Sequence, residues 1–319
     1  MFRVIGALGL LSVAFFLNAG HLYAGSKVDW GKINPALKGA TSSGSISSCL
    51  DCHEDYIKSF AKTKHARYFK KKLGKSLAQS CEDCHGPMST HVTEPDFDKK
   101  QSTTVSFKTI TPQQKNQICQ QCHEKQTTLH WRGSTHEMAN VSCDKCHYVM
   151  ARKSKRRLSI NEDSKKACFA CHKDKRARML RSAHMPLREG KMDCSSCHNP
   201  HGSLAPNLLK EATLNETCYL CHQEKRGPML WEHAPVREDC SSCHDSHGSN
   251  HLSMLKMKQP YLCQACHSNT GHPDTLYDAT DLPPSGSQFT SLALAGKACL
   301  NCHSRIHGSN HPSGARFMR

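Results

Sequence analysis

Apolar residues are concentrated at the start of the chain and become sparse afterwards. Residues 4–17 form a run of 14 mostly apolar residues that follows a single charge, Arg3. Such a run is too short for a stable transmembrane helix, and a basic residue before it is typical of a secretory signal peptide. We therefore predict a signal peptide over residues 1–24, with cleavage after Ala24, and an exported mature chain.

The remainder of the chain has too few apolar side chains to build an ordinary core. Aromatic residues make up 6% of the sequence and its mean hydropathy is −0.61. A domain of this length normally buries a large aliphatic and aromatic core. Disulfides, metal clusters or a bulky cofactor must therefore fill the interior. We expect little regular secondary structure, with short helices joined by loops. Residues 25–48 are predicted to be a mobile lead-in, and 49–319 one elongated body.

Twenty cysteines form a repeated motif of two cysteines, two residues apart, followed by a histidine. The motif occurs ten times and leaves no cysteine over. The cysteines are Cys49, Cys52, Cys81, Cys84, Cys119, Cys122, Cys143, Cys146, Cys168, Cys171, Cys194, Cys197, Cys218, Cys221, Cys240, Cys243, Cys263, Cys266, Cys299 and Cys302. The histidines are His53, His85, His123, His147, His172, His198, His222, His244, His267 and His303.

This spacing is typical of c-type haem attachment. Two cysteines one helical turn apart can form thioethers to the two vinyl groups of a haem, and the adjacent histidine then faces the iron. A single copy is also found in zinc sites and in redox-active cysteine pairs. Ten copies in an exported chain favour haem, and a disulfide framework would not need a histidine after each pair. We predict ten covalently bound haems, which supply the missing apolar interior.

Twelve other histidines of the mature chain are candidates for the second axial ligand. Taken two at a time, the motifs begin about every 50 residues, and each pair encloses one histidine and is followed by another in most cases. The predicted distal ligands are His65, His91, His136, His184, His201, His233, His247, His272 and His307.

The short spacing from the preceding motif histidine limits which haem three of these ligands can bind. His201 and His247 each follow a motif histidine by three residues, and His307 follows one by four. Three residues span at most about 10 Å, which is too short to pass round a porphyrin to its opposite face. We therefore predict that these histidines bind neighbouring haems and link adjacent repeats.

The second pair of motifs departs from this pattern. Met150 stands three residues after His147, where other pairs carry a histidine. Methionine is a haem ligand that raises the potential relative to two histidines, and it is also a common apolar packing residue. Met150 is our predicted tenth distal ligand. His130, His311, His251 and an open coordination site are the alternatives.

The basic charge of the chain is offset by the predicted cofactors. The formal net charge is +16, or about +15 without Arg3. Twenty ionised propionates contribute about −20, and ten ferric irons about +10, so the loaded protein ranges from about +5 oxidised to −5 reduced. No nucleic-acid-binding motif accompanies the charge, and we predict no nucleic-acid partner.

Three functions suit such a chain: an electron conduit, a multihaem reductase with one open haem, and a diffusing periplasmic shuttle. Twelve spare histidines for ten sites argue against an open haem. No catalytic constellation of serine, histidine and carboxylate accompanies the motifs. We therefore predict an electron-transfer protein rather than an enzyme.

The chain resembles the MtrA/DmsE family of periplasmic decahaem cytochromes. The resemblance is carried by residues 218–249, by residues 299–314 (CLNCHSRIHGSNHPSG) and by Cys84-His85-Gly86-Pro87. Motif number and spacing agree over nearly the whole mature chain. The family usually has histidine at the position of Met150, which leaves the ligand of one haem to be decided.

The resemblance implies a location and partners. Members of the family look like wires inserted in an outer-membrane β-barrel protein, and a closed barrel can shield a polar wire from lipid. Electrons would come from a periplasmic or inner-membrane cytochrome. They would pass to a cell-surface multihaem cytochrome or a molybdopterin reductase, with metal oxide or dimethyl sulfoxide as the final acceptor.

Overall fold

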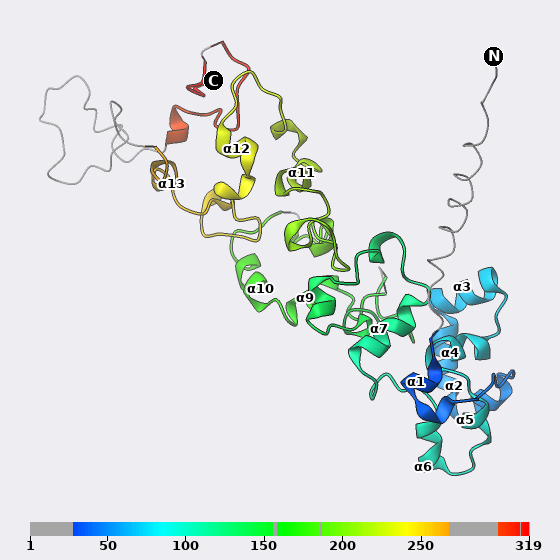
Figure 1. Ribbon diagram of the computed structural model, residues 1–319. Coiled ribbons are helices and arrows are strands. Elements are labelled where there is room, and N and C mark those ends of the chain that lie inside the picture. Colours follow the sequence, from blue (N-terminus) through cyan, green and yellow to red (C-terminus); the bar gives the residue numbers. More distant parts are fainter. Residues whose placement is uncertain (1–27, 156–157, 186, 268–298, 313, 319) are drawn as a thin grey trace, which may run out of the picture. The chain divides into compact units, whose positions relative to one another are not determined.

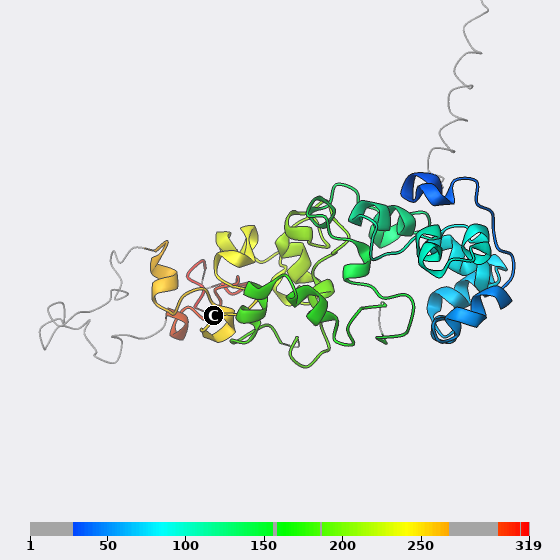
Figure 2. The ribbon, with the colours of Figure 1, turned by 90° about the horizontal axis from the view of Figure 1, so that it is seen from below.

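The computed structural model describes residues 28–155, 158–185, 187–267, 299–312 and 314–318. The predicted signal peptide, the first residues of the lead-in and His272 lie outside these ranges. Within them the chain forms short α-helices and 3₁₀ helices and no β-strand (Figures 1 and 2). This architecture confirms the prediction of short helices joined by loops, with little regular structure. No helix of the described residues is long and apolar enough to cross a membrane.

The chain divides into two compact units. Unit 1 extends to Trp131 and also includes Glu137–Lys153, and unit 2 comprises Arg132–His136 and Ser154–Arg319. The single haem-binding body predicted for residues 49–319 remains a prediction.

Unit 1 contains the longer helices, because its sequence supplies strong helix ends. Thr63 caps one helix and Gly74, at φ +63°, terminates it. Ser76 and Thr111 each form a capping box with a glutamine three residues on. The elements are α1 (Trp30–Ile33), η1 (Pro35–Leu37), α2 (Ser47–Ala61), α3 (Lys64–Leu73), α4 (Leu77–His85), α5 (Ser89–Thr93), α6 (Phe97–Lys100), η2 (Gln101–Thr103), α7 (Pro112–Gln120), η3 (Gln126–Thr128) and η4 (Cys143–Lys145), and α8 (Thr135–Met138) spans the division between units.

Unit 2 is built from shorter elements that alternate in type. First cysteines of odd-numbered motifs lie in α-helices, and those of even-numbered motifs begin 3₁₀ turns. The elements are α9 (Ser164–Phe169), α10 (Lys173–Met179), η5 (Cys194–Ser196), η6 (Pro206–Leu208), α11 (Leu214–Tyr219), η7 (Gln223–Lys225), α12 (Ala234–Glu238), η8 (Cys240–Ser242), η9 (Leu252–Met254), α13 (Tyr261–Gln264) and η10 (Cys299–Asn301).

Both clusters of buried apolar residues found in the described chain belong to unit 1. One contains Val28, Leu37, Val105 and Ile118, and the other Phe60, Ala66 and Phe69. Unit 2 buries only isolated apolar side chains such as Leu187 and Leu209. A bulky apolar cofactor is therefore needed most in unit 2.

The predicted lead-in is packed where it is described. Val28 and Leu37 are buried against Val105 and Ile118, so residues 28–37 form part of the core of unit 1. Gly86 permits this approach, because a Cβ there would lie 2.7 Å from Leu37 Cδ1. These buried side chains attach residues 28–37 to unit 1, and the mobility of residues 25–48 remains a prediction.

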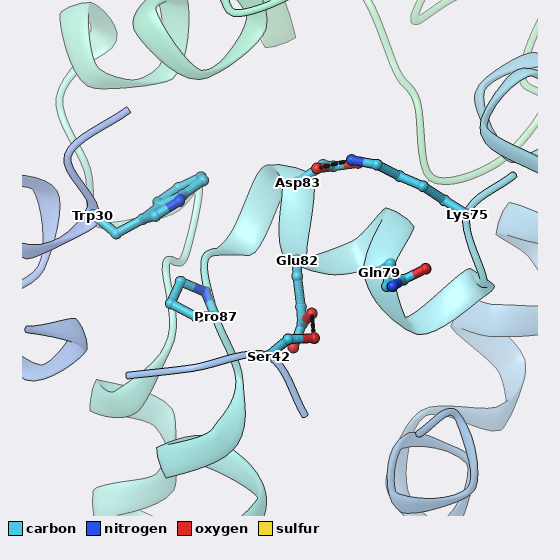
Figure 3. A pocket seen from close by; sticks show the side chains of 7 residues that line it. All are labelled: Trp30, Ser42, Lys75, Gln79, Glu82, Asp83 and Pro87. Carbon is cyan, nitrogen blue, oxygen red and sulfur yellow. Dashed lines mark hydrogen bonds and ion pairs between the residues drawn. The ribbon is translucent and has the colours of Figure 1, made fainter. Parts of the chain in front are cut away.

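A pocket of about 320 Å³ lies between this segment and α4 (Figure 3). Glu82 accepts hydrogen bonds from the hydroxyl of Ser42 and the amide of Ser43, and Lys75 Nζ contacts both carboxylate oxygens of Asp83 at 2.6 and 2.7 Å. By helical periodicity Glu82 and Asp83 lie on the face of α4 opposite Cys81 and Cys84. The pocket therefore lies where the N-terminal segment, through Trp30 and Ser42, packs beside α4.

Candidate haem-binding site

Seven pairs of histidines place their rings at a nearly constant separation. Each pair joins one motif histidine to one predicted distal histidine, with ring centres 6.0–6.3 Å apart. The pairs are His53–His91, His65–His123, His136–His172, His184–His222, His198–His247, His233–His267 and His244–His307.

The separation suits two axial ligands on one iron. Imidazole nitrogens bind transition-metal ions at about 2.0–2.1 Å, which puts the ring centres of two imidazoles on opposite sides of one ion roughly 6 Å apart. Four pairs have ring planes 10–18° apart and three have planes 63–77° apart. Either orientation is compatible with ligation, because a ring can rotate about its bond to the metal. The residues present therefore fit haem.

The direction of pairing differs between odd and even motifs, except at the first motif, whose His53 lies beside the later His91. His123, His172, His222 and His267 each lie beside a histidine that comes earlier in the chain. In contrast, His198 and His244 lie beside His247 and His307, which follow the motif two further on. Because His247 and His307 follow a motif histidine so closely, they were predicted to bind neighbouring haems. The structure places them beside His198 and His244, which belong to other motifs.

Four of the five even-numbered motifs are followed by a loop that returns to the motif histidine. His198 Nδ1 lies 2.8 Å from the carbonyl oxygen of Asn207, and His244 Nδ1 lies 2.8 Å from that of Ser253. His85 and His303 make the corresponding contacts with Val105 and Arg316, at 2.8 and 2.6 Å. A carbonyl accepting from Nδ1–H leaves Nε2 free to bind metal and fixes the ring.

Two isolated β-bridges join segments that carry predicted distal histidines. Ser249 pairs with Ser182, and Ser309 pairs with Trp231. Gly248 and Gly308 allow these close approaches, because a Cβ at either would lie within 2.5 Å of Arg178 O or Met229 Sδ. Each bridge connects a loop that carries one distal histidine to the segment that carries another.

The motif thiols lie next to one another in chain order. Within four of the five pairs of motifs, the thiols of the first cysteines lie close enough to influence each other's ionisation: Cys119 with Cys143, Cys168 with Cys194, Cys218 with Cys240, and Cys263 with Cys299. Electrostatic contact also links Cys49 to Cys81, and second cysteines across pairs: Cys84 to Cys122, Cys197 to Cys221, and Cys243 to Cys266. Every step between consecutive motifs inside one unit is represented.

Buried asparagines fix two of these steps, and the sequence prediction missed them. Asn116 Oδ1 accepts from the amide of Cys143 at 2.9 Å, and Asn215 Oδ1 accepts from that of Cys240 at 2.8 Å. Each asparagine stands three residues before the first cysteine of the preceding motif. Their repeated position was the available signal.

Burial favours the forms of these groups that suit haem attachment. It is the largest cause lowering the pKa of His65, His123, His247 and His307, so these imidazoles favour the neutral form that binds metal. Burial also raises the pKa of Cys84 to about 12. Such a thiol is not a reactive thiolate at neutral pH, in line with a structural role.

The remaining predicted ligands are placed as follows. His147 interacts electrostatically with His65 and His123, and the backbone amide of His201 donates to Asn199 Oδ1. Met150 packs against the cluster of Phe60, Ala66 and Phe69. His251 and His311 occupy matching turns, in which their amides donate to Ser249 Oγ and Ser309 Oγ at 3.0 Å.

The described residues do not support the competing chemistries. None of the twenty cysteines forms a disulfide. No group of three or more histidine, cysteine or acidic side chains that could hold a metal ion is found in the described part of the chain. Two imidazoles and two thiols are also a ligand set of structural zinc sites, but a tetrahedral zinc ion would bring the two ring centres closer together than the 6.0–6.3 Å found in the pairs.

Comparison with known proteins agrees with this assignment. The family model of a doubled CXXCH motif matches residues 136–177, 184–227 and 233–272, and that of cytochrome c552 matches residues 11–127. The chain is 41% identical over 276 residues to a multiheme cytochrome MtrA from Shewanella baltica (strain OS185), covering 85% of this chain and 80% of the relative. Each doubled-motif match begins at a histidine, His136, His184 or His233, that pairs with the second motif histidine of the same match.

Proposed function

We propose that this chain, which belongs to the MtrA family of multihaem c-type electron-transfer cytochromes, binds ten haems and relays electrons across the outer membrane. In this proposal it is periplasmic and lies inside a β-barrel partner. It accepts electrons from a periplasmic or inner-membrane cytochrome. It delivers them to a cell-surface multihaem cytochrome or molybdopterin reductase.

The contact between thiols of consecutive motifs carries the proposal. Haems supply one-electron carriers when bound, and each is held at its edge by two thioethers. Cys119 lies beside Cys143 and Cys122 lies beside Cys84, so the two cysteines of the third motif face the fourth and the second motif. This arrangement supports the proposal that the haems within each unit follow one another in chain order and lie close together, which is what a relay requires.

The imidazole pairs support a relay over a reductase. A reductase needs an iron with an open position for its substrate. Seven of the ten predicted irons have two imidazoles at the separation that ligation requires. Two strong ligands keep an iron six-coordinate, so these positions suit electron transfer alone.

Reconstitution tests the proposal directly. The holoprotein with its barrel partner is placed in liposomes that enclose a redox dye, and a membrane-impermeant reductant is added outside. We expect the dye to be reduced only when both proteins are present. Reduction by the barrel alone, or no reduction by the complete assembly, would count against the conduit.

The haem count is tested separately. Alkaline pyridine haemochrome absorbance per mole of protein should correspond to ten haems, and the oxidised spectrum should be low-spin. A substantial high-spin signal would favour the reductase.

A further inference from the structure

The pairing rule of the even-numbered motifs extends to the one position that lacks a histidine. His247 follows the eighth motif and pairs with His198 of the sixth, and His307 follows the tenth and pairs with His244 of the eighth. Apart from His91, which follows the second motif, has no even motif before it and pairs with His53 of the first, the histidine that follows an even motif in these pairs thus serves the even motif two positions earlier. Applied to the fourth motif, the same rule assigns Met150 to His85 of the second.

His85 is prepared as a ligand but has no imidazole beside it. Its Nδ1 is 2.8 Å from Val105 O, and its ring meets Phe107 at 5.7 Å. Among the described residues no second histidine ring lies at the 6 Å separation found in the seven pairs. The histidines that influence it electrostatically are His53 and His91, and these already form a pair with each other.

Met150 belongs to the same unit as His85 and lies near the helix that carries it. Met150 and Leu77 both pack against the cluster of Phe60, Ala66 and Phe69. Leu77 is the first residue of α4, and it lies one turn before Cys81 on the same face of that helix. Met150 and the first turn of α4 therefore pack against the same apolar cluster. A flexible methionine side chain can reach a ligating position from there.

We propose that Met150 is the sixth ligand of the haem held by Cys81, Cys84 and His85. This inference rests on the proposed function, since it requires a c-type haem at the second motif. A methionine ligand raises the reduction potential relative to two histidines. The second site is then the one at which an electron rests most stably, so the relay is uneven near its N-terminal end.

Near-infrared spectroscopy of the oxidised holoprotein tests the inference. Ligation by methionine gives ferric haem a sulfur-to-iron charge-transfer band that two histidines do not give. We expect a band corresponding to one haem per chain. Met150→His should abolish it, keep every haem low-spin and lower the potential of one haem in a redox titration. Met150→Leu should abolish it and make one haem high-spin. Met138→Leu, at an exposed methionine of the same unit, should leave it unchanged.

Removing one attachment site identifies the haem. Cys81→Ala with Cys84→Ala should eliminate the second haem and the band together. Absence of the band in the unmodified protein, its survival in Met150→Leu, or its survival after loss of the second haem would each overturn the inference. Failure of the conduit is distinguishable, because dye reduction in liposomes can fail while the band is present. A haem count below the expected value would expose failure of the attachment itself.

Discussion

Replacement of Asn215 by alanine should destabilise unit 2 at the step between the seventh and eighth motifs. Asn215 is 6% exposed and makes three hydrogen bonds. Its Nδ2 donates to Val236 O at 3.0 Å and to Arg237 O at 2.9 Å, and its Oδ1 accepts from the amide of Cys240 at 2.8 Å. Alanine removes all three and leaves that amide without its acceptor.

The expected loss follows from which groups water can reach. Val236 and Arg237 are not buried, so water can replace the bonds to their carbonyls at a cost of a few tenths of a kcal/mol each. The amide of Cys240 begins a 3₁₀ turn inside the thiol contact with Cys218, and an unsatisfied donor costs about 1–3 kcal/mol. We therefore expect a total of about 2–4 kcal/mol.

Guanidinium unfolding of the holoprotein, followed by circular dichroism, measures this loss. Asn250→Ala is the matched control, because Asn250 is an exposed asparagine of the same unit. Asn116→Ala should reproduce the effect in unit 1, where Asn116 holds Cys143. The reasoning is refuted if Asn215→Ala and Asn250→Ala unfold within about 0.5 kcal/mol of each other, the range of ordinary surface substitutions.

Other substitutions and one titration probe the ligands and the charge. His247→Ala should convert one haem to high-spin in the oxidised electron paramagnetic resonance spectrum, whereas His251→Ala should not; equal effects would invalidate the assignment of His247. Gly308→Ala places a Cβ 2.3 Å from Met229 Sδ and should displace the neighbouring ligand, giving a similar high-spin signal. Gly314→Ala has the same left-handed backbone but open space, and it should retain the low-spin spectrum. Full reduction should lower the isoelectric point, since the net charge falls by about ten units, and an unchanged isoelectric point would argue against ten redox-active irons.

Sequence reasoning identified the chemistry of this chain because haem attachment needs fixed residue types at fixed spacing. Two cysteines and a histidine must lie within one helical turn, and no packing context replaces them. Reach gave a second constraint, since three residues cannot span a porphyrin. It required a distant partner for His247, which the structure places beside His198.

What the sequence did not show is how the repeats are joined. The asparagine bonds at Asn116 and Asn215 link residues 21 or more positions apart, and local spacing does not predict contacts of that kind. The packing of Val28 and Leu37 depended on Val105 and Ile118, residues of quite different segments. A short apolar stretch next to a polar one does not indicate, by itself, whether the segment packs against the rest of the chain.

Exchange of ligands makes the motifs depend on one another in both directions. An odd motif such as that of His222 takes a histidine from earlier in the chain, His184, and an even one such as that of His244 takes His307 from later. A single repeat excised from unit 2 would therefore lose ligands at both ends, although it contained both of its own attachment sites. The apolar clusters of the described chain lie in unit 1, so unit 2 has little besides its cofactors and these exchanged histidines to hold it together. Haem loading and folding of unit 2 must then be one process, because neither the ligand pairs nor the interior is complete before the neighbouring repeats are in place.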